Sequence, residues 1–304
     1  MEHPRRAIVP AAVTRIAFAT CAELLVLDPD DELLAEAVRA LGAEVEPKVW
    51  DDGDVDWGAY DLVLVRSPWD YHLRRDAFVH WAERVAGLTR LRNSAATIAW
   101  NTDKVYLRRL AEQGVPTVPT AWIEAGATTD FAALLADRGW SGRETIVKPS
   151  IGLGSSNLLR VAPGDPDGAG ARHLADLTAS GTAMVQPFIP SLATEGELSL
   201  VWCEGALSHI VRKRPPAGEF RVQPEFGAVT TADTATDEQL AVAERALALA
   251  GDEAPLYARV DLVAGPAGEV WLMELELVEP TLYLAPAPGS AERFAAAVVA
   301  AARG

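Results

Sequence analysis

The chain has 304 residues, of which 49% are hydrophobic, and it carries a formal net charge of −16 at pH 7. This length and hydrophobic content are enough for two or three domains or subdomains with a buried core. The negative charge excludes a general binder of nucleic acid or anionic membranes, because binding to phosphate-rich surfaces needs a basic surface. Small phosphorylated ligands stay possible, since they need only a few local cations.

The two cysteines, Cys21 and Cys203, form no disulfide framework, and neither they nor the five histidines show metal-ligand spacing. We interpret both cysteines as buried free thiols and expect a reducing, cytoplasmic location. The N-terminal stretch has basic residues and a short apolar run, but Arg15 interrupts the run before a signal-like core can form. No run approaches the ~18 apolar residues that a membrane span needs.

The N-terminal part predicts a parallel α/β unit. A strand over 15–20 precedes a helix that ends at Gly42, and two more strands follow over 44–50 and 60–66. Strand, helix, strand in this order implies parallel pairing, and ligands of such sheets gather beyond the carboxyl ends of the strands. The turn RSPWDY would lie there, with four candidate substrate contacts, Arg66, Ser67, Trp69 and Asp70. A Pro-containing turn anchored by aromatic residues is an equally good interpretation.

The segment WNTDKVYLRRLAEQG follows a predicted helix over 75–86 and predicts another helix. Asn101 or Thr102 would cap this helix and Gly114 would end it. Lys104 then falls in the first turn, where the helix dipole disfavours a cation. This cost suggests a function for Lys104, with a solvated lysine as the alternative.

Lys148 comes directly after a strand over 145–147, and the loop PSIGLGSSN follows it. The loop is flexible and rich in hydrogen-bond donors, which suits it to cover phosphates; its candidate residues are Ser150, Gly152, Gly154 and Ser155. The lysine precedes the glycines, so the pattern is neither the common phosphate-binding loop nor the dinucleotide fingerprint. A helix near 171–179 and a strand over 183–185 complete a small α+β unit.

The linker QPFIP comes next, and we expect its backbone groups to hydrogen-bond a flat heterocycle while Phe188 or Ile189 packs on it; Gln186 begins the linker. A hairpin over 197–202 and 206–212 leads into a basic loop that includes Lys213 and Arg221. Cations are conspicuous in so acidic a chain, although a solvated basic loop is an alternative. A helix over 237–250 and a closing helix over 291–302 are also predicted.

The stretch YARVDLVAGPAGEVWLMELELVEPTLY predicts two strands, over 256–263 and 269–278, joined by a Gly/Pro-rich link. Side chains alternate along a strand, so Arg259 and Asp261 share one face, as do Glu274 and Glu276. The opposite face of the second strand would turn a row of apolar residues to the core: Trp271, Met273, Leu275 and Leu277.

One guanidinium cannot neutralise the three carboxylates of this hairpin. Oxygen-only ligands suit a hard cation such as Mg²⁺ or Mn²⁺ better than zinc. The alternative is an edge hairpin whose polar face is simply hydrated.

The order of these elements resembles the ATP-grasp superfamily of carboxylate–amine ligases, which includes glutathione synthetase and D-alanine–D-alanine ligase. The resemblance covers residues 15–285. The motifs RSPWDY, NTDK and ELELVEPTLYL are similar to those of the branch that contains the O-ureido-D-serine cyclo-ligase of cycloserine biosynthesis.

The resemblance implies ATP and Mg²⁺ as cofactors, with Mn²⁺ as a possible substitute. Lys104 and Lys148 would contact ATP, and Glu197 would hold the ribose hydroxyls. Adenine would be read by the hinge residues Gln186, Phe188 and Ile189. The metal would be carried by Asp261, Glu274 and Glu276, although the family more often has Asn at the last position. Catalysis at the terminal phosphate would depend on Arg259, Arg221 and Lys213.

The fold that the resemblance implies combines α/β and α+β parts. They are an N-terminal parallel α/β domain over 1–95, a central lid subdomain over 96–190 and a C-terminal antiparallel-sheet subdomain over 191–304. The expected reaction activates a small carboxylic acid as an acyl phosphate and joins it to a nitrogen nucleophile, within one molecule or between two. Alternatives are a nucleotide-binding regulatory module without turnover and a phosphotransferase without ligation. A homodimer is compatible with the sequence, which does not decide the oligomeric state.

Overall fold

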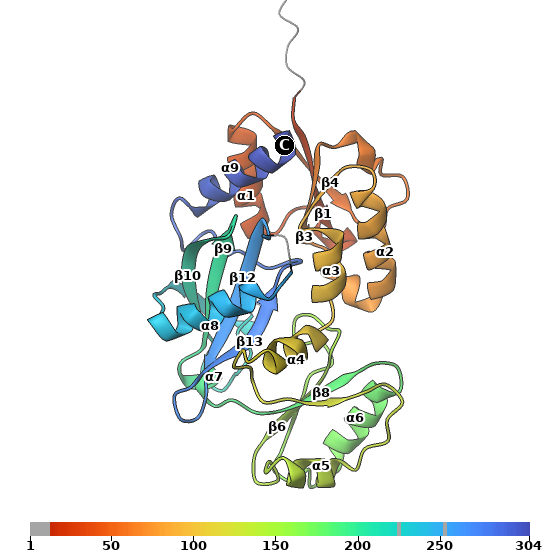
Figure 1. Cartoon of the computed structure of the whole chain (residues 1–304), viewed down its shortest axis with the longest axis vertical. Coiled ribbons are helices and arrows are strands. Elements are labelled where there is room, and N and C mark those ends of the chain that lie inside the picture. Colours follow the sequence, from red (N-terminus) through yellow and green to blue (C-terminus); the bar gives the residue numbers. More distant parts are fainter. Residues whose placement is uncertain (1–12, 224–225, 252–253) are drawn as a thin grey trace, which may run out of the picture.

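The computed structural model describes residues 13–223, 226–251 and 254–304. Three β-sheets follow one another along the long axis of the molecule (Figure 1). The N-terminal sheet lies at the top of this view, the largest sheet lies in the middle, and a small sheet built from the centre of the chain lies at the bottom. The predicted combination of a parallel sheet with antiparallel sheets is confirmed.

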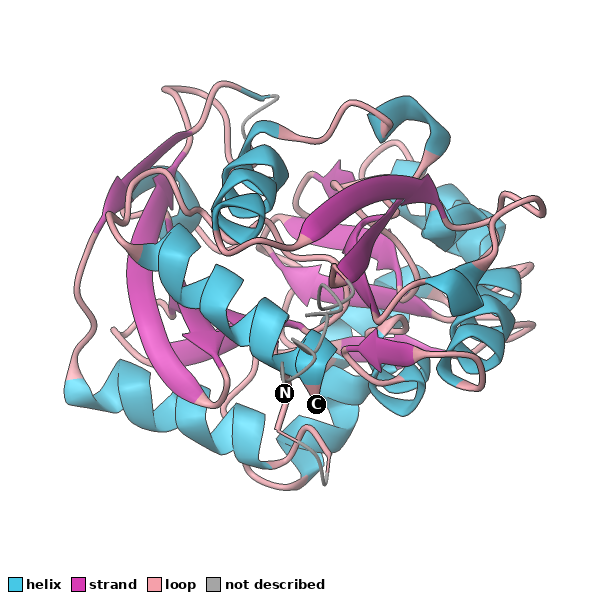
Figure 2. Cartoon of the chain, turned by 90° about the horizontal axis from the view of Figure 1, so that it is seen from above, coloured by secondary structure: helices cyan, strands magenta, loops and turns pink. Residues whose placement is uncertain are grey.

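The N-terminal sheet is parallel, with the order β2-β1-β3-β4. Its strands are β1 (Arg15–Thr20), β2 (Glu44–Val49), β3 (Leu62–Ser67) and β4 (Arg90–Arg92). The helices that flank it are α1 (Pro29–Ala40), α2 (Arg75–Ala86) and α9 (Ser290–Arg303). Alternate residues of β1 face opposite sides, so Phe18 packs with α1 and α9 while Ala17 packs with α2. Seen from above, helices lie on both sides of the strands of the molecule (Figure 2).

The last helix returns to the N-terminal sheet. Phe294 and Val298 of α9 share a core with Ile16 of β1 and Leu34 of α1. The residues that follow the C-terminal sheet therefore pack with the first domain in space. The domain boundaries predicted from the sequence stay a prediction.

The central unit has an antiparallel sheet with the order β5-β8-β6-β7. Its strands are β5 (Ala121–Ile123), β6 (Thr145–Pro149), β7 (Leu159–Val161) and β8 (Ala183–Pro187). Two helices, α5 (Phe131–Asp137) and α6 (Ala169–Thr178), share a core with this sheet through Leu135 and Leu174.

Two short helices lead into this unit, and they correct one prediction. The helix α3 (Ala95–Asn101) ends at Asn101, and α4 (Val105–Glu112) begins four residues later. Neither Asn101 nor Thr102 therefore caps α4. Instead the Asn101 side chain forms hydrogen bonds with the backbone of Leu275 on β13 and of Leu277 just after it, at 2.8 and 2.7 Å.

The C-terminal sheet has the order β11-β10-β9-β12-β13 and is antiparallel throughout. Its strands are β9 (Glu197–Cys203), β10 (Ala206–Arg214), β11 (Val229–Ala232), β12 (Tyr257–Ala264) and β13 (Val270–Glu276). A short helix, α7 (Ser191–Thr194), precedes the sheet, and α8 (Asp237–Ala248) covers one face of it through Val242 and Ala246. This leaves the other face for charged side chains.

A β-bulge in β13 overturns part of the predicted core row. Asp261 pairs with Glu274, but the next residue of β12, Leu262, pairs with Leu272, which leaves Met273 as an extra residue. The bulge shifts the alternation by one residue, so Leu272 lies in the core with Leu275 and Leu277. Met273 lines a cavity instead of the core, and Trp271 is only partly buried beside it.

The contact between α9 and the N-terminal unit gives a stability prediction. Phe294 is 1% exposed, so Phe294→Ala should leave a cavity and lower the free energy of unfolding by about 3–5 kcal/mol. Urea unfolding measures this change. Leu73→Ala is the matched control, because Leu73 is 73% exposed and its truncation should change the free energy by less than about 0.5 kcal/mol. An equal effect of both substitutions would contradict the packing of α9.

Candidate active site

A cavity of about 710 Å³ lies where the three sheets meet, a volume typical of small-molecule and cofactor sites. The N-terminal unit contributes Trp69, the central unit contributes Lys148 and the loop after it, and the C-terminal sheet contributes its charged face. Four of the predicted cations, Lys104, Lys148, Lys213 and Arg259, line it.

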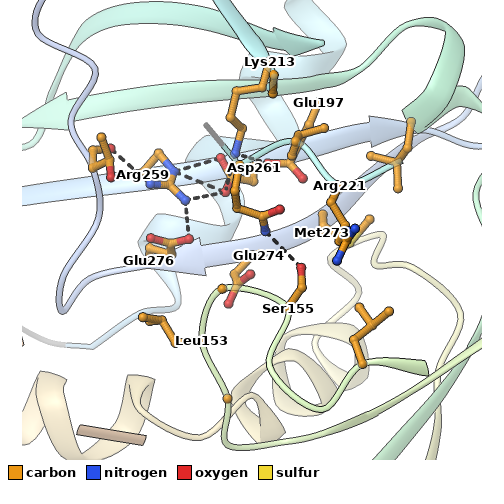
Figure 3. Close-up of a pocket in the computed structure, with 18 of the residues that line it drawn as sticks. Leu153, Ser155, Glu197, Lys213, Arg221, Arg259, Asp261, Met273, Glu274 and Glu276 are labelled. Atoms are coloured by element: carbon orange, nitrogen blue, oxygen red, sulfur yellow. Dashed lines mark hydrogen bonds and ion pairs between the residues drawn. The ribbon is translucent and has the colours of Figure 1, made fainter. Parts of the chain in front are cut away.

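The hairpin β12–β13 supplies the centre of the charged face (Figure 3). Arg259 is paired across the strands with Glu276, and Asp261 with Glu274, so the predicted sharing of one face is confirmed. The Arg259 guanidinium binds Asp261 with Nη2–Oδ2 at 2.9 Å and also forms an ion pair with Glu276. Burial opposes ionisation of Asp261, but Arg259 and Lys213 outweigh it and hold the pKa of Asp261 well below its usual value.

Lys213 extends from β10 to two acids of neighbouring strands. Its ammonium group forms an ion pair with Glu197 of β9, and its Nζ lies 3.4 Å from Oδ2 of Asp261. Ser199 of β9 donates a 2.5 Å hydrogen bond to the other oxygen of Asp261. Burial would lower the pKa of Lys213, but Asp261 and Glu197 outweigh it and raise that pKa above its usual value. Lys213 is therefore a fixed cation in the cavity wall.

Lys104 has partners that explain its unfavourable place at the start of α4. Its Nζ lies 2.8 Å from Oε1 of Glu274 and 2.7 Å from the carbonyl oxygen of Gly152. The lysine thereby joins the hairpin β12–β13 to the loop after β6. Lys148 lies in the same cavity, and burial lowers its pKa. Burial also opposes ionisation of Glu274, but Lys104 and Lys148 keep its pKa below the usual value.

The loop after β6 and the segment 220–223 face each other across the cavity. Gly154 and Ser155 adopt left-handed backbone conformations, with φ of 55° and 61°. Gln223 donates a 3.2 Å hydrogen bond to the Ser155 hydroxyl. Gly152 also lines the cavity, whereas Ser150 is buried outside its lining and accepts a 2.9 Å hydrogen bond from the backbone of Lys104.

The hinge residues Gln186, Phe188 and Ile189 line the cavity, and their contact with a heterocycle stays a prediction. The Gln186 amide donates a 2.8 Å hydrogen bond to Thr120, and the guanidinium carbon of Arg160 lies 3.9 Å from the centroid of the Phe188 ring. Arg221 lines the cavity while its Nη2 lies 2.7 Å from Glu219. These contacts hold the hinge in place, and the side of the hinge that faces the cavity forms part of the cavity wall.

The RSPWDY turn reaches the cavity through one of its four candidates. Trp69 lines the cavity, whereas Arg66, Ser67 and Asp70 do not. Arg66 is buried, with its Nε 2.8 Å from Asp31 and its Nη2 3.0 Å from the carbonyl oxygen of Pro280. The Ser67 and Thr20 hydroxyls share a hydrogen bond of 3.1 Å, and Asp70 accepts a hydrogen bond of 2.8 Å from the Trp50 indole. Direct substrate contact by these three residues stays a prediction.

Sequence reasoning missed Glu279. It is 6% exposed, lines the cavity, and accepts a hydrogen bond from the hydroxyl of Tyr71. Burial raises its pKa to about 7, although Lys104 opposes the rise. Strand alternation gave no signal because Glu279 lies beyond the end of β13. The only signal was that Glu279 is the third acid in the motif ELELVEP.

The oxygen ligands present fit a hard divalent cation. Burial raises the pKa of Glu276 to about 8 despite Arg259, and Glu274 and Asp261 add to the rise. The acids of the cavity therefore exceed the charge that its cations neutralise. Within residues 13–223, 226–251 and 254–304, no three His, Cys, Asp or Glu side chains are already arranged as a metal site. Glu274 would have to exchange Lys104 for a metal, and Glu276 would have to exchange Arg259.

Comparisons with known proteins agree with this geometry. Residues 16–93 match the family described as D-cycloserine synthetase DcsG, N-terminal domain. The cycloserine biosynthesis protein DcsG of Streptomyces lavendulae is 36% identical over 298 residues, which cover 93% of this chain and 97% of that protein. A glutathione synthetase of Prochlorococcus marinus is 26% identical over 200 residues, covering 66% of this chain and 59% of the relative.

Solved structures show the same fold. The crystal structure of D-cycloserine synthetase DcsG has a TM-score of 0.83 and 35% identity, and the match covers 95% of this chain and 99% of that one. D-Alanine–D-alanine ligase of Bacillus anthracis has a TM-score of 0.66 at 13% identity, with 96% and 98% covered. The molecule thus has the ATP-grasp fold and is a carboxylate–amine ligase by class. Within that class, the chain belongs to the family of the cycloserine synthetase DcsG.

The part of the chain that the structure describes contains no helix long and apolar enough to cross a membrane.

The raised pKa of Glu279 gives a prediction for pH. The usual pKa of 4.5 applies to the unfolded chain and about 7 to the folded protein, so the folded state binds more protons between these values. Without divalent cations, the free energy of unfolding should therefore fall as pH rises through this range, with a share of roughly 2–3 kcal/mol from Glu279. Glu279→Gln should remove that share in urea unfolding. Glu238→Gln, at an exposed position, should leave the slope unchanged, and a parental slope in Glu279→Gln would contradict the assigned environment.

Proposed function

We propose that the protein activates the carboxylate of a small amino acid or derivative with ATP and closes it onto a nitrogen nucleophile, releasing ADP and phosphate. The observation that carries the proposal is the convergence of Lys104, Lys148, Lys213 and Arg259 on one cavity that also contains the acids of β12–β13. ATP carries about four negative charges, so its binding and reaction need such cations together with a divalent metal.

ATP would lie between the two antiparallel sheets. Adenine would rest against the hinge at Phe188 and Ile189, and the phosphates would extend toward Lys148 and Lys104. The glycine-containing loop after β6 would cover them with its backbone N–H groups. Glu197 would hold the ribose hydroxyls, which requires it to share its carboxylate with Lys213.

Asp261, Glu274 and Glu276 would hold Mg²⁺, with Mn²⁺ as an alternative. When bound, the metal would draw negative charge from the phosphate oxygens and orient the terminal phosphoryl group. This chain's own residues would do the rest. Arg259 is anchored to Asp261 and can place its guanidinium beside the transferred group, and Lys213 and Arg221 lie in the same wall.

The chemistry has two steps. A carboxylate oxygen of the substrate bonds to the γ-phosphorus of ATP, the bond from this phosphorus to the bridging oxygen breaks, and ADP leaves. A nitrogen of the nucleophile then bonds to the acyl carbon, the bond from this carbon to the phosphate oxygen breaks, and the proton lost by the nitrogen ends on the released phosphate. Fixed cations such as Arg259 stabilise the charge that develops on the oxygens in both steps.

The relatives indicate which class of product to expect. The protein from Streptomyces lavendulae takes part in cycloserine biosynthesis, and the structure with a TM-score of 0.83 is a D-cycloserine synthetase. We infer that the nucleophile here belongs to the same molecule as the activated carboxyl group and that the product is a small cyclic amide. O-ureido-D-serine is the first acid to test.

Substrate-dependent release of ADP tests the reaction. With Mg²⁺, ATP and O-ureido-D-serine or another small amino acid, ADP and phosphate should accumulate together with a cyclic amide. Arg259→Met should cut kcat by roughly a hundredfold or more, because it removes a fixed guanidinium from a charged transition state. ATP affinity should fall much less. ADP with a stable phosphorylated acid would instead indicate a phosphotransferase, and ATP binding without turnover would indicate a regulatory module.

Lys148 tests the nucleotide site separately. Lys148→Ala should weaken ATP binding by roughly tenfold to a hundredfold, since a charge-assisted contact is worth about 1.5–3 kcal/mol. Its thermal melt without nucleotide should stay close to that of the parent, because Lys148 forms no ion pair within the described residues. Calorimetry with ATP measures the affinity. Equal ATP affinities of variant and parent would show that Lys148 does not belong to the nucleotide site.

A further inference from the structure

Glu279 differs from the acids that the C-terminal sheet places in the cavity in having no cation of its own. Asp28 and Asp30 of the N-terminal unit also line the cavity and form no ion pair among the described residues, but unlike Glu279 they are only partly buried. Glu197 pairs with Lys213, Glu274 with Lys104, and Glu276 with Arg259. Over the described ranges, Glu279 has no lysine, arginine or histidine nitrogen within 4.0 Å, although it is only 6% exposed. A carboxylate buried without a cation is costly, so its place in a cavity wall points to a positive group brought by a ligand.

The backbone that carries Glu279 is held by side chains from several elements. The segment 278–284 follows β13 without regular structure, yet the carbonyl oxygens of its first five residues each lie within hydrogen-bond distance of a side-chain donor. The donors to residues 278–282 are, in order, Tyr257, Trp69, Arg66, Arg259 and His209. Asp30 of α1 accepts hydrogen bonds from the backbone of Leu282 and Leu284 at 2.8 and 2.6 Å. The position of Glu279 is therefore fixed before any ligand binds, as in preorganised sites.

Glu279 lies on the side of the cavity that the N-terminal unit builds. The Tyr71 hydroxyl bonds its carboxylate, and the Trp69 indole bonds its backbone carbonyl oxygen at 3.3 Å. Among the cations, Lys104 lowers the pKa of Glu279 the most, and Lys104 also forms an ion pair with Glu274. Glu279 is thus a neighbour both of Lys104, which is proposed to contact phosphate, and of Trp69. In an α-amino acid the ammonium group is two bonds from the carboxyl carbon, so an activated carboxyl group near Lys104 brings its ammonium group close to Glu279.

We propose that Glu279 is the specificity-determining residue that binds the ammonium group of an amino-acid substrate at this site. The proposal rests on the proposed function, because it assumes that the activated acid occupies this cavity. Tyr71 orients the carboxylate, and Arg66 and Asp30 act as positioning residues through the backbone of the segment 278–284. Acids without an amino group would leave Glu279 buried without a cation, and they would bind more weakly for that reason.

Two ring compounds test the assignment: D-cycloserine, which carries a primary amino group, and isoxazolidin-3-one, the same ring without it. Calorimetry with Mg²⁺ and ADP present, below the pKa of the amino group, gives the dissociation constant of each. The parent should prefer D-cycloserine by about tenfold or more, the usual value of a charge-assisted hydrogen bond. Glu279→Gln, which keeps the size of the side chain, should reduce the preference to less than about threefold. Glu279→Asp should keep part of it.

The exposed variant Glu238→Gln is the matched control and should keep the parental preference. ADP affinity should be the same in all variants, which shows that they fold and bind nucleotide. The assignment is overturned if the parent has no preference or binds neither ring, or if Glu279→Gln keeps the preference. It is also overturned if Glu279→Gln loses ADP affinity to the same extent, since Glu279 would then serve the metal or the nucleotide. ADP release by the parent is measured separately. If the parent releases ADP but Glu279→Gln keeps the parental preference, the proposed function stands and only the assignment of Glu279 is overturned.

Discussion

The cavity depends on the burial of acids and cations together on one face of the C-terminal sheet. Asp261 is the centre of this arrangement, because Arg259, Lys213 and Ser199 all bind it from β12, β10 and β9. Buried charges are tolerated only when they are paired and hydrogen-bonded, so the removal of one partner would leave another uncompensated. The same pairing keeps Arg259 and Lys213 positively charged and fixed in place, as catalysis on a phosphoryl group requires.

In the proposed function, the ion pairs also set what a metal and a nucleotide would have to do on binding. Glu274 is held by Lys104 and Glu276 by Arg259, so neither carboxylate is free for a metal until its cation finds another anion. The phosphates of ATP are such anions. Metal and nucleotide would therefore bind together, with the lysine and arginine moving from the carboxylates to phosphate while the carboxylates move to the metal. This exchange conserves charge inside a buried site, where unpaired charge is costly.

The N-terminal unit acts on the cavity through the segment 278–284. Asp30, Arg66 and Trp69 belong to α1, β3 and the turn after β3, and each binds the backbone of this segment. The N-terminal sheet is thus joined to the charged face of the C-terminal sheet by hydrogen bonds as well as by the apolar core that α9 shares with α1. Changes in the RSPWDY turn can reach the active site through this segment.

The features that the sequence predicted correctly are those that depend on local periodicity. Alternation along a strand placed Arg259 and Asp261 on one face with Glu274 and Glu276, and the structure agrees. It failed at Met273, because a bulge inserts one residue without any break in the apolar pattern. The burial of Arg66 could not be predicted, since its partners Asp31 and Pro280 lie 35 and 214 residues away along the chain. Glu279 was missed for the same reason, as its surroundings are set by distant contacts.

The central claim is that a carboxylate oxygen of the substrate is transferred to phosphate through an acyl phosphate. The most direct test uses O-ureido-D-serine with ¹⁸O in its carboxylate, and phosphorus NMR of the products. The account predicts ADP together with inorganic phosphate that carries one ¹⁸O atom from the acid. Unlabelled phosphate would show that water attacked ATP, and AMP with pyrophosphate would show that the acid was adenylated; either result would contradict the account.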